Sequence, residues 1–235
     1  MSQLPWLDHS LNFPPPQSAL KEPDGLLAAG GDLSSERIVA AYRSGIFPWF
    51  SDDQPILWWS PNPRCIIKPD QAYISKSLRK HIRKTDIALS FDTQFETVIR
   101  HCARLNTNEG TWITPEMEEA YIQLHLKGVA HSVEVWENGE LSGGLYGLAI
   151  GRCFFGESMF SLKTNSSKVA FISLCNQLHK WGYAIVDCQV ENPHLLSLGA
   201  KTLDRCEFLS ILETNIDLAP LSHSWAFELC MNTLS

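Results

Sequence analysis

Residues 45–64 constrain the fold of this chain most strongly, because they combine bulky aromatic side chains with four prolines. Proline removes a backbone N–H donor and interrupts helices and central strands, so this segment is predicted to be an ordered loop. Aromatic rings on such a loop predict the wall of a cleft, where a flat ring can stack on a nucleobase. The alternative is that the rings only attach a small N-terminal unit to the rest of the chain. The aromatic residues are Phe47, Trp49, Phe50, Trp58 and Trp59.

The composition is that of a globular protein with enough apolar mass for a core: 235 residues, 44% hydrophobic and 19% charged. No apolar run approaches the roughly 20 residues that span a bilayer. The first residues lack a basic segment followed by an apolar one, which is the pattern of a signal peptide. We therefore expect a cytoplasmic protein. The seven cysteines are scattered without a Cys-x-x-Cys pair, which favours reduced thiols and no metal site.

The net charge is −7, but the cations are unevenly distributed. Seven of the 19 basic residues lie between residues 64 and 84, where only Asp70 opposes them. Ile74, Leu78 and Ile82 recur every four residues, which predicts a helix with cations on its remaining faces. A solvated surface helix would usually mix charge signs, so we favour contact with RNA phosphates. The cations assigned to this contact are Lys76, Arg79, Lys80, Arg83 and Lys84.

The remaining pattern predicts an α+β chain, with a small N-terminal domain over residues 1–65 and a larger domain over 66–235. In the smaller domain, a helix is expected after Ser34, ending at Gly45. In the larger domain, Thr93 and Glu96 form a capping box that begins one helix, and Thr114 caps another. A two-residue period after residue 130 predicts an antiparallel meander. The expected strands are 87–91, 131–137, 140–150, 153–160 and 184–190, and a long helix is expected over 167–181.

Polar residues end the apolar strand 184–190, in the order Asp187, Cys188 and Gln189. Because side chains alternate along a strand, Asp187 and Gln189 are predicted to face one side and Cys188 the other. Two polar groups that leave a buried strand together must be hydrogen-bonded to each other or functional, since unpaired burial is costly. Both interpretations remain open for this pair.

Glu157 lies in Gly156-Glu-Ser-Met-Phe160, which approaches the Gly-x-Ser-x-Gly elbow of serine hydrolases. The second glycine is absent, and the segment lies in a meander rather than in a strand-to-helix turn, so we reject that chemistry. Glu157 could instead receive a cationic group in the same cleft as Asp187. A solvated strand edge explains it equally.

Nine blocks, in order and over nearly the whole chain, resemble the leucyl/phenylalanyl-tRNA–protein transferase family. They are Gly-Gly-Asp-Leu-Ser (30–34), Tyr-Arg-Ser-Gly-Ile-Phe-Pro-Trp-Phe (42–50), Trp-Trp-Ser-Pro-Asn-Pro-Arg (58–64), Gly-Thr-Trp-Ile-Thr (110–114), His-Ser-Val-Glu-Val-Trp (131–136), Gly-Gly-Leu-Tyr-Gly (143–147), Phe-Phe-Gly-Glu-Ser-Met-Phe-Ser (154–161), Asp-Cys-Gln (187–189) and His-Leu-Leu-Ser-Leu-Gly-Ala (194–200).

The resemblance implies a bacterial cytoplasmic enzyme that transfers Leu or Phe, with Met as a further candidate, from aminoacyl-tRNA to a protein. The acceptor would be the N-terminal α-amine of a protein beginning with Arg or Lys, which is then marked for degradation by the N-end rule. The resemblance further implies an acetyltransferase-like (GNAT) C-terminal domain, with a mainly antiparallel sheet flanked by helices, and neither a metal nor a coenzyme.

The resemblance also implies that Trp49 and Trp112 stack on the 3′-adenosine. We interpret Gln189 as orienting the amine near the ester and Asp187 as holding Gln189, so both are candidate catalytic residues. Glu157 and Asp187 would attract the Arg or Lys of the acceptor. Because an aminoacyl ester is already activated, the main task is to position the amine. The implied pocket for the aminoacyl side chain consists of Leu145, Phe155, Met159, Leu174, Leu178 and Ile185.

Two rival functions remain at this stage. An acetyl-CoA-dependent acetyltransferase needs a Gly-rich pyrophosphate loop at the start of a helix. The nearest match, His179-Lys-Trp-Gly182-Tyr-Ala184, lies at the predicted end of a helix. A non-catalytic RNA-binding module would need only the basic helix and the aromatic segment, and it leaves the pair Asp187 and Gln189 unexplained.

Overall fold

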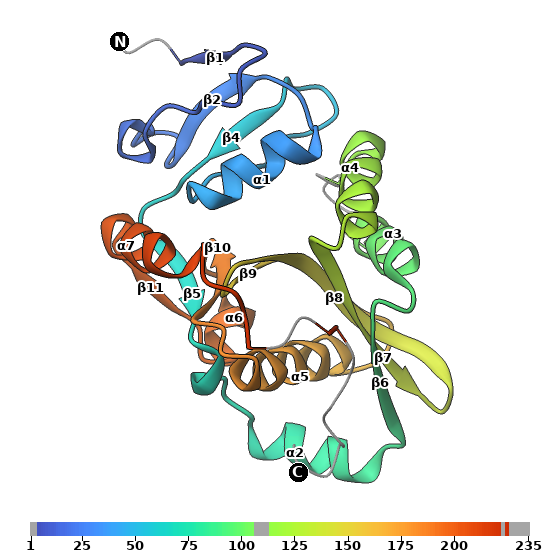
Figure 1. Ribbon diagram of the computed structural model, residues 1–235. Helices are drawn as coiled ribbons and strands as arrows, with labels where there is room; N and C mark the ends of the chain where they lie inside the picture. The colour runs from blue at the N-terminus through green and yellow to red at the C-terminus, as the bar shows by residue number, and fades with distance from the viewer. Residues whose placement is uncertain (1–3, 106–112, 222–223, 226–235) are drawn as a thin grey trace.

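The chain folds around two β-sheets, a four-stranded sheet near the N-terminus and a seven-stranded sheet built from later residues (Figure 1). The computed structural model describes residues 4–105, 113–221 and 224–225. The predicted adenosine-stacking residue Trp112 lies outside these described residues.

The N-terminal part contains four short strands and one α-helix. They are β1 (Trp6–Leu7), η1 (Pro16–Ser18, a 3-10 turn), β2 (Leu26–Gly30), α1 (Ser35–Arg43), β3 (Phe47–Pro48) and β4 (Leu57–Trp59). The strand order is β1-β2-β4-β3, with β1 parallel to β2 and the other pairs antiparallel. The expected helix after Ser34 is confirmed as α1. The Ser34 hydroxyl caps it by accepting a hydrogen bond from the backbone N–H of Arg37. Gly45 follows the helix with a φ of +74°, a conformation that favours glycine.

The expectation that 45–64 lacks regular structure is wrong, because β3 and β4 lie within it. Pro48 fits β3 because β3 is the edge strand of its sheet, where a missing N–H donor leaves no ladder bond broken. Trp58 on β4 is fully buried, and its Nε1 donates to the Gly30 carbonyl at 2.9 Å. Trp58 therefore packs the small sheet, whereas Trp49 is 47% exposed.

The larger sheet has the strand order β11-β5-β10-β9-β8-β7-β6. β9 and β10 pair in parallel, and the other neighbouring pairs in this sheet are antiparallel. The strands are β5 (Arg64–Ile67), β6 (Ile87–Phe91), β7 (Ala130–Glu137), β8 (Glu140–Ile150), β9 (Cys153–Ser161), β10 (Ile185–Gln189) and β11 (Lys201–Leu203). The predicted α+β class, with a small N-terminal unit and a mainly antiparallel sheet, is confirmed.

Helices flank both faces of this sheet. They are η2 (Pro69–Gln71), α2 (Lys76–Lys84), α3 (Phe95–Leu105), α4 (Pro115–Leu126), α5 (Ser166–Lys180), α6 (Pro193–Ser197) and α7 (Arg205–Asn215). Figure 1 draws α5 and α2 below the sheet and α3 and α4 above its right-hand part. None of the described helices is long and apolar enough to cross a membrane.

Two hydrophobic cores lie on opposite faces of the larger sheet. One contains residues of α1, α3, α4 and α7, and the other contains residues of α2, α5 and α6. Successive strand residues alternate between them. Phe154 belongs to the core between the sheet and α5, and Phe155 belongs to the core between the sheet and α4. This parity decides which side chains reach the pocket described below.

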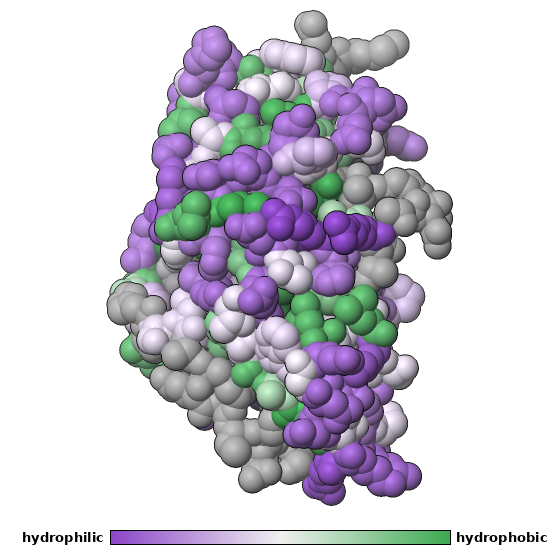
Figure 2. All heavy atoms as spheres, turned by 90° about the vertical axis from the view of Figure 1, so that its right-hand side faces the viewer, coloured by the Kyte–Doolittle hydropathy of each residue, from purple (hydrophilic) through white to green (hydrophobic). Residues whose placement is uncertain are grey.

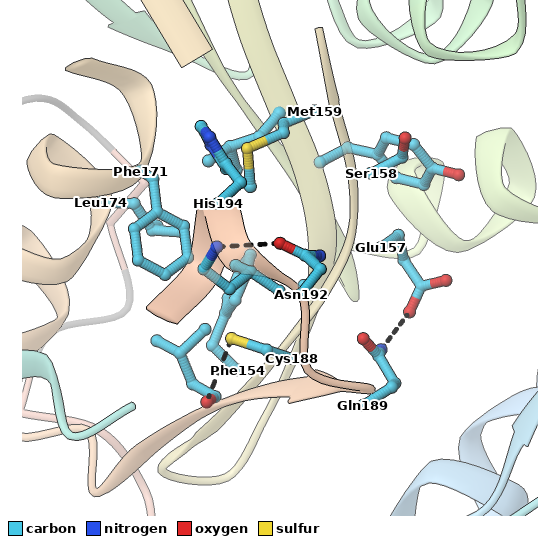
Figure 3. A pocket seen from close by; sticks show the side chains of 15 residues that line it. Phe154, Glu157, Ser158, Met159, Phe171, Leu174, Cys188, Gln189, Asn192 and His194 are labelled. Carbon is cyan, nitrogen blue, oxygen red and sulfur yellow. Dashed lines mark hydrogen bonds between the residues drawn. The ribbon is translucent and has the colours of Figure 1, made fainter. Parts of the chain in front are cut away.

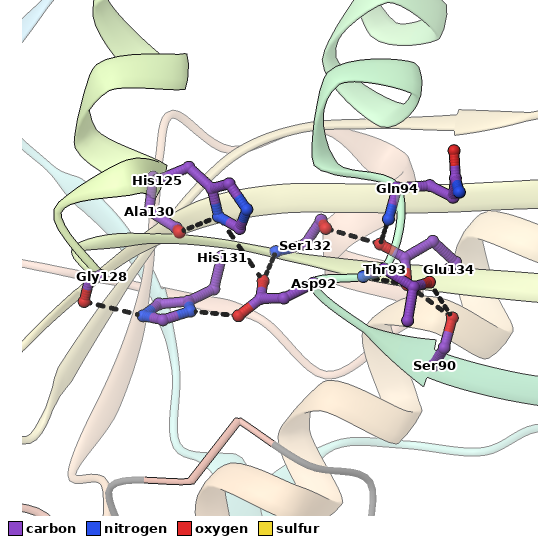
Figure 4. A network of polar contacts seen from close by, with 10 residues as sticks. All are labelled: Ser90, Asp92, Thr93, Gln94, His125, Gly128, Ala130, His131, Ser132 and Glu134. Atoms are coloured by element: carbon purple, nitrogen blue, oxygen red, sulfur yellow. Dashed lines mark hydrogen bonds and ion pairs between the residues drawn. The ribbon is translucent and has the colours of Figure 1, made fainter.

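A buried carboxylate on β7, Glu134, fixes the start of α3 (Figure 4). It accepts hydrogen bonds from the hydroxyls of Ser90, Thr93 and Ser132 at 2.6–2.8 Å, and from the backbone N–H groups of Thr93 and Gln94 at 3.4 Å. The helix was predicted to begin with a local capping box at Thr93. That capping box stays a prediction. Glu134 holds the two residues that directly precede the helix, Thr93 and Gln94, and these hydrogen bonds compensate the burial of its carboxylate.

The proposed division into residues 1–65 and 66–235 stays a prediction. The small sheet ends at Trp59 and the larger sheet begins at Arg64, so a boundary between the two sheets would fall at 60–63, just before β5. The strands β5 and β11 were not predicted. β5 is only four residues long and directly follows the proline-rich segment.

Candidate functional site

A pocket of about 250 Å³ opens where β8, β9 and β10 meet α5 and α6 (Figure 3). One side is apolar and includes Phe154, Phe171 and Leu174. The other side carries the polar pair Glu157 and Gln189. The remaining lining residues are Leu145, Tyr146, Gly156, Ser158, Met159, Val186, Cys188, Asn192, His194 and Leu195.

Half of the predicted aminoacyl pocket lines this cavity, namely Leu145, Met159 and Leu174. The other half, Phe155, Leu178 and Ile185, does not line it and is fully buried elsewhere. On β9 and β10 the residues that line this cavity are the sequence neighbours of the predicted ones, and the aminoacyl pocket itself stays a prediction. Phe154 pairs with Val186 in the parallel register and faces the cavity, so their neighbours face the opposite core.

A second pocket, of about 200 Å³, lies beside the first and is lined by Trp49 together with Phe47, Pro48 and Val190. Both pockets share Glu157, Cys188 and Gln189 as lining residues. The half-exposed Trp49 ring is held through its backbone, because Trp59 Nε1 donates to the Trp49 carbonyl at 2.6 Å. The structure thus brings the predicted ring at 49 next to the carboxamide at 189.

Glu157 is the carboxylate that reaches both pockets. Its Oε1 accepts the Tyr42 hydroxyl at 2.6 Å, and its Oε2 accepts the Tyr121 hydroxyl at 3.0 Å. Gln189 Nε2 donates to Oε1 at 3.4 Å. Burial raises the pKa of Glu157 to about 7, even though both tyrosine hydroxyls stabilise its charged form. This carboxyl group therefore changes charge near neutral pH.

Asp187 lies away from both pockets and is fully buried. Arg64 Nε donates to Asp187 Oδ1 at 2.8 Å, and Arg64 Nη2 donates to Oδ2 at 2.7 Å. Asp187 Oδ1 also accepts the backbone N–H of Gln189 at 3.0 Å. This carboxylate is thus held by an arginine, with no side available to a substrate.

The predicted alternation at the end of β10 is wrong. Cys188, which was expected to face away from Gln189, lines both pockets with it, and Asp187 lines neither. The cause is a register shift against β5 between Asp187 and Gln189, together with a positive φ of +55° at Gln189. Such an irregularity turns the last residues of the strand out of the two-residue period.

Sequence reasoning missed three functional candidates: Arg64, Tyr42 and Tyr121. Arg64 was counted in the basic surface cluster, but it is fully buried. Its position directly before the apolar run 65–67 was the available signal, because a cation that enters a buried strand needs a buried partner. The two tyrosines lie on helices at ordinary core positions, and no local pattern distinguishes them.

The predicted basic surface lies on α2. Leu78 and Ile82 are buried, and the cations Lys76, Arg79, Lys80, Arg83 and Lys84 are exposed. Within the described part of the chain, none of these cations has an acidic partner. The lower end of the molecule, at the level of α2, is mostly hydrophilic in Figure 2. Among the described residues, this surface thus presents positive charge without acidic partners, which suits contact with a polyanion.

Two further observations concern cofactors. Among the described residues, no three His, Cys, Asp or Glu side chains gather in a way that could hold a metal ion. The sequence 179–184, the nearest match to a pyrophosphate loop, lies at the C-terminal end of α5. A helix C-terminus presents carbonyl groups and a negative dipole end, which does not suit a pyrophosphate.

Comparison with known proteins gives consistent matches over most of the chain. The family model described as leucyl/phenylalanyl-tRNA protein transferase matches residues 66–213, and the model of its N-terminal domain matches 31–62. A protein of Hahella chejuensis named leucyl/phenylalanyl-tRNA–protein transferase is 61% identical over 227 residues, which cover 96% of each chain. A protein of the same name from Pseudomonas fluorescens is 55% identical, covering 91% of this chain and 96% of its own.

Among solved structures, a GCN5-related N-acetyltransferase from Kribbella flavida aligns with a TM-score of 0.38 and 9% identity, covering 69% of this chain and 58% of its own.

Proposed function

Because this chain belongs to the leucyl/phenylalanyl-tRNA protein transferase family, we propose that it transfers Leu or Phe, with Met as a further donor, from aminoacyl-tRNA to proteins that begin with Arg or Lys. Family membership makes the chain an aminoacyltransferase that moves an aminoacyl group from tRNA to a protein. The proposed acceptor atom is the N-terminal α-amine, and the product would be marked for degradation by the N-end rule. Since charged tRNA is a cytoplasmic substrate, the reaction would take place in the cytoplasm.

The observation that carries this proposal is the junction of the two pockets at Glu157 and Gln189. In the proposed complex, the terminal adenine stacks on Trp49, and the Leu or Phe side chain enters the apolar pocket. The ester that joins them then lies beside Gln189. The family resemblance also assigns Trp112 to adenosine stacking, and this residue lies outside the described residues.

Glu157 is the proposed partner of the acceptor's Arg or Lys side chain. It lies at the junction of the pockets, and its charged form would attract a cation in a partly buried site. Asp187 is the less suitable partner because it is fully buried, lines neither pocket and already forms an ion pair with Arg64. We therefore assign acceptor binding to Glu157, and the support of Gln189 to Asp187.

The chemistry needs little beyond positioning. The α-amine attacks the ester carbonyl, a C–N bond forms, the C–O bond to the ribose breaks, and the 3′-oxygen leaves with a proton. The α-amine has a pKa of about 7.7–8, so about a tenth of it is already neutral at pH 7. Gln189 Nε2 faces Glu157, which leaves its carbonyl oxygen as the acceptor for an amine N–H. Holding the amine near the carbonyl then supplies most of the acceleration.

The exposed cations of α2 are the proposed contacts for tRNA phosphates, remote from the ester. Five such cations would contribute to the affinity for tRNA in a way that depends on salt concentration and not on nucleotide sequence. The basis is charge alone: an acidic chain with a net charge of −7 carries these cations together on one helix, and none of them has an acidic partner among the described residues.

The direct test is to mix the purified chain with radiolabelled Leu-tRNA and a peptide that begins with Arg. Label should enter the peptide. A matched peptide beginning with Asp should stay unlabelled, and so should the Arg peptide with an acetylated N-terminus, because it offers no free amine. Equal labelling of the Arg and Asp peptides would refute the proposed acceptor specificity, and no labelling at all would refute the transfer.

A further inference from the structure

The guanidinium group of Arg64 is enclosed on every side. Besides its two bonds to Asp187, Arg64 Nη1 donates to the Gly45 carbonyl at 3.2 Å. Its Cζ lies 4.9 Å from the ring centroid of Phe47 and 4.6 Å from that of Phe208 on α7. The Arg64 side chain is fully buried. The planar guanidinium group can donate two parallel hydrogen bonds to one carboxylate while its faces contact two aromatic rings. A lysine ammonium group cannot do both.

Arg64 connects the two segments that flank the pocket junction. On one side, Gly45 and Phe47 begin the short segment that carries Trp49. On the other side, the Asp187 carboxylate holds the backbone N–H of Gln189, which has a φ of +55°. A positive φ is unfavourable for a residue other than glycine, so the surrounding contacts must impose it.

Stability alone is a weak explanation for this buried ion pair. Replacing a buried pair with apolar side chains of similar volume is often neutral or stabilising, because two charges no longer have to leave water. Removing one partner is different, since it leaves an unpaired charge in the interior. The pair is better explained by what its geometry fixes, which is the placement of the Trp49 segment relative to Gln189.

We propose that Arg64 is a positioning residue for aminoacyl transfer: it sets the distance between the ring that stacks the terminal adenine and the carboxamide that orients the amine. It acts through Asp187 and through the Gly45–Phe47 segment, and it does not touch the substrate. This inference rests on the proposed function of the same site. The proposal implies that loss of the two Arg64–Asp187 hydrogen bonds lowers turnover even in a stable protein, because a small misplacement of the reacting groups slows the reaction strongly.

The test separates positioning from stability. Arg64→Met should lower the melting temperature and reduce kcat by about 100-fold. The double variant Arg64→Met/Asp187→Leu removes both charges and should regain the melting temperature, while kcat stays low. Arg64→Lys keeps a charge without the fork and should also lower kcat. In each variant the KM for Phe-tRNA should change less than kcat, because the α2 surface is intact.

Arg37 provides the matched control, since it is also fully buried and bonded to the Ser10 and Asp8 carbonyls and to Asp32, away from both pockets. Arg37→Met should lower the melting temperature and leave kcat unchanged. A double variant at 64 and 187 that regains both stability and kcat would overturn the positioning role, as would wild-type kcat in Arg64→Lys. Both results count against the positioning role only if the wild-type chain transfers label in the same assay. If the wild type shows no transfer, the proposed function itself is refuted.

Discussion

The Tyr42 hydroxyl on α1 donates a 2.6 Å hydrogen bond to Glu157 Oε1 on β9, across 115 residues of sequence. Tyr121 on α4 donates to the other oxygen, and the two hydroxyls lie 2.7 Å apart. Burial, together with the charge of Glu157, raises the pKa of both tyrosines, so both remain protonated donors. The N-terminal unit and the larger sheet thus jointly hold the carboxylate at the pocket junction.

The pH dependence of transfer to an Arg peptide should report the titration of Glu157. Its pKa is raised to about 7, so the carboxylate that attracts the acceptor cation forms as the pH rises from 6 to 8. The amine titrates in a similar range, so the ratio of kcat/KM between wild type and Glu157→Gln is the quantity to measure. That ratio should increase through about pH 7, and a ratio that is flat between pH 5.5 and 8.5 would contradict the assignment.

The same carboxyl group should make stability depend on pH. Its folded-state pKa lies above the ordinary value of 4.5, so the folded state binds the proton more tightly than the unfolded state. The resulting stabilisation is present below pH 4.5 and is lost as the pH rises through 7, by at most about 3 kcal/mol. Urea unfolding at several pH values should therefore show wild type losing stability relative to Glu157→Gln. A constant difference would place the pKa of Glu157 near its ordinary value.

Trp49→Ala should weaken binding of the aminoacyl-tRNA end. Base stacking on an aromatic ring contributes roughly 1–3 kcal/mol, which corresponds to about a 5- to 150-fold increase in KM for Phe-tRNA. The control is Trp6→Ala, because Trp6 is 70% exposed on β1 and lines neither pocket. Steady-state kinetics at a fixed peptide concentration measure both. An unchanged KM in Trp49→Ala would remove the ring from the proposed adenine site.

Phe154→Leu and Phe155→Leu form a matched pair of variants that tests which face of β9 contributes to the aminoacyl pocket. Phe154 lines the cavity, so its replacement should change the ratio of kcat/KM between Phe-tRNA and Leu-tRNA. Phe155 packs edge-on against Tyr42 at 5.1 Å in the opposite core. Its replacement should cost about 1 kcal/mol of stability and leave the ratio unchanged. If the donor ratio shifted in Phe155→Leu alone, the assignment of the two faces would be reversed.

The sequence predicted Phe155 and Ile185 in the pocket, whereas their neighbours Phe154 and Val186 line the cavity. This one-residue difference shows what the sequence pattern could not specify. The meander and the helix α5 follow strong periodic patterns, and they were predicted within a few residues. At residues 153–155 and 185–186, however, both faces of the strands are buried, so no polar alternation indicates which side chains meet the pocket. Family resemblance supplied the pocket's apolar character without its register.

The ion pair between Arg64 and Asp187 was out of reach for a different reason. The two residues are 123 positions apart, and neither lies in a local pattern that points to the other. The strand pairing of β5 with β10 brings them together, and β5 itself was not predicted. Contacts that depend on the pairing of distant strands follow from topology, which local periodicity does not specify.

Neutralising the α2 surface should change how tRNA binding depends on salt. The variant Arg79→Gln/Lys80→Gln/Arg83→Gln removes three exposed cations. If each contacts a phosphate, the slope of log K against log salt concentration should become shallower by about 2 to 3, because fewer counterions are released. Turnover at saturating tRNA should stay unchanged, since α2 is absent from the lining of both pockets.

The control for this variant replaces cations that already have partners. Arg100 is paired with Glu96 and Glu118, and Lys127 with Glu36, so both are exposed but locally neutralised. Arg100→Gln/Lys127→Gln removes two positive charges, against three in the α2 variant, and should leave the salt slope as in wild type. If both variants shifted the slope alike, overall charge would explain the binding and α2 would lose its special role. A shift confined to the α2 variant would locate the phosphate contacts on that helix, because the two variants differ in where the lost charges lie rather than in their sign.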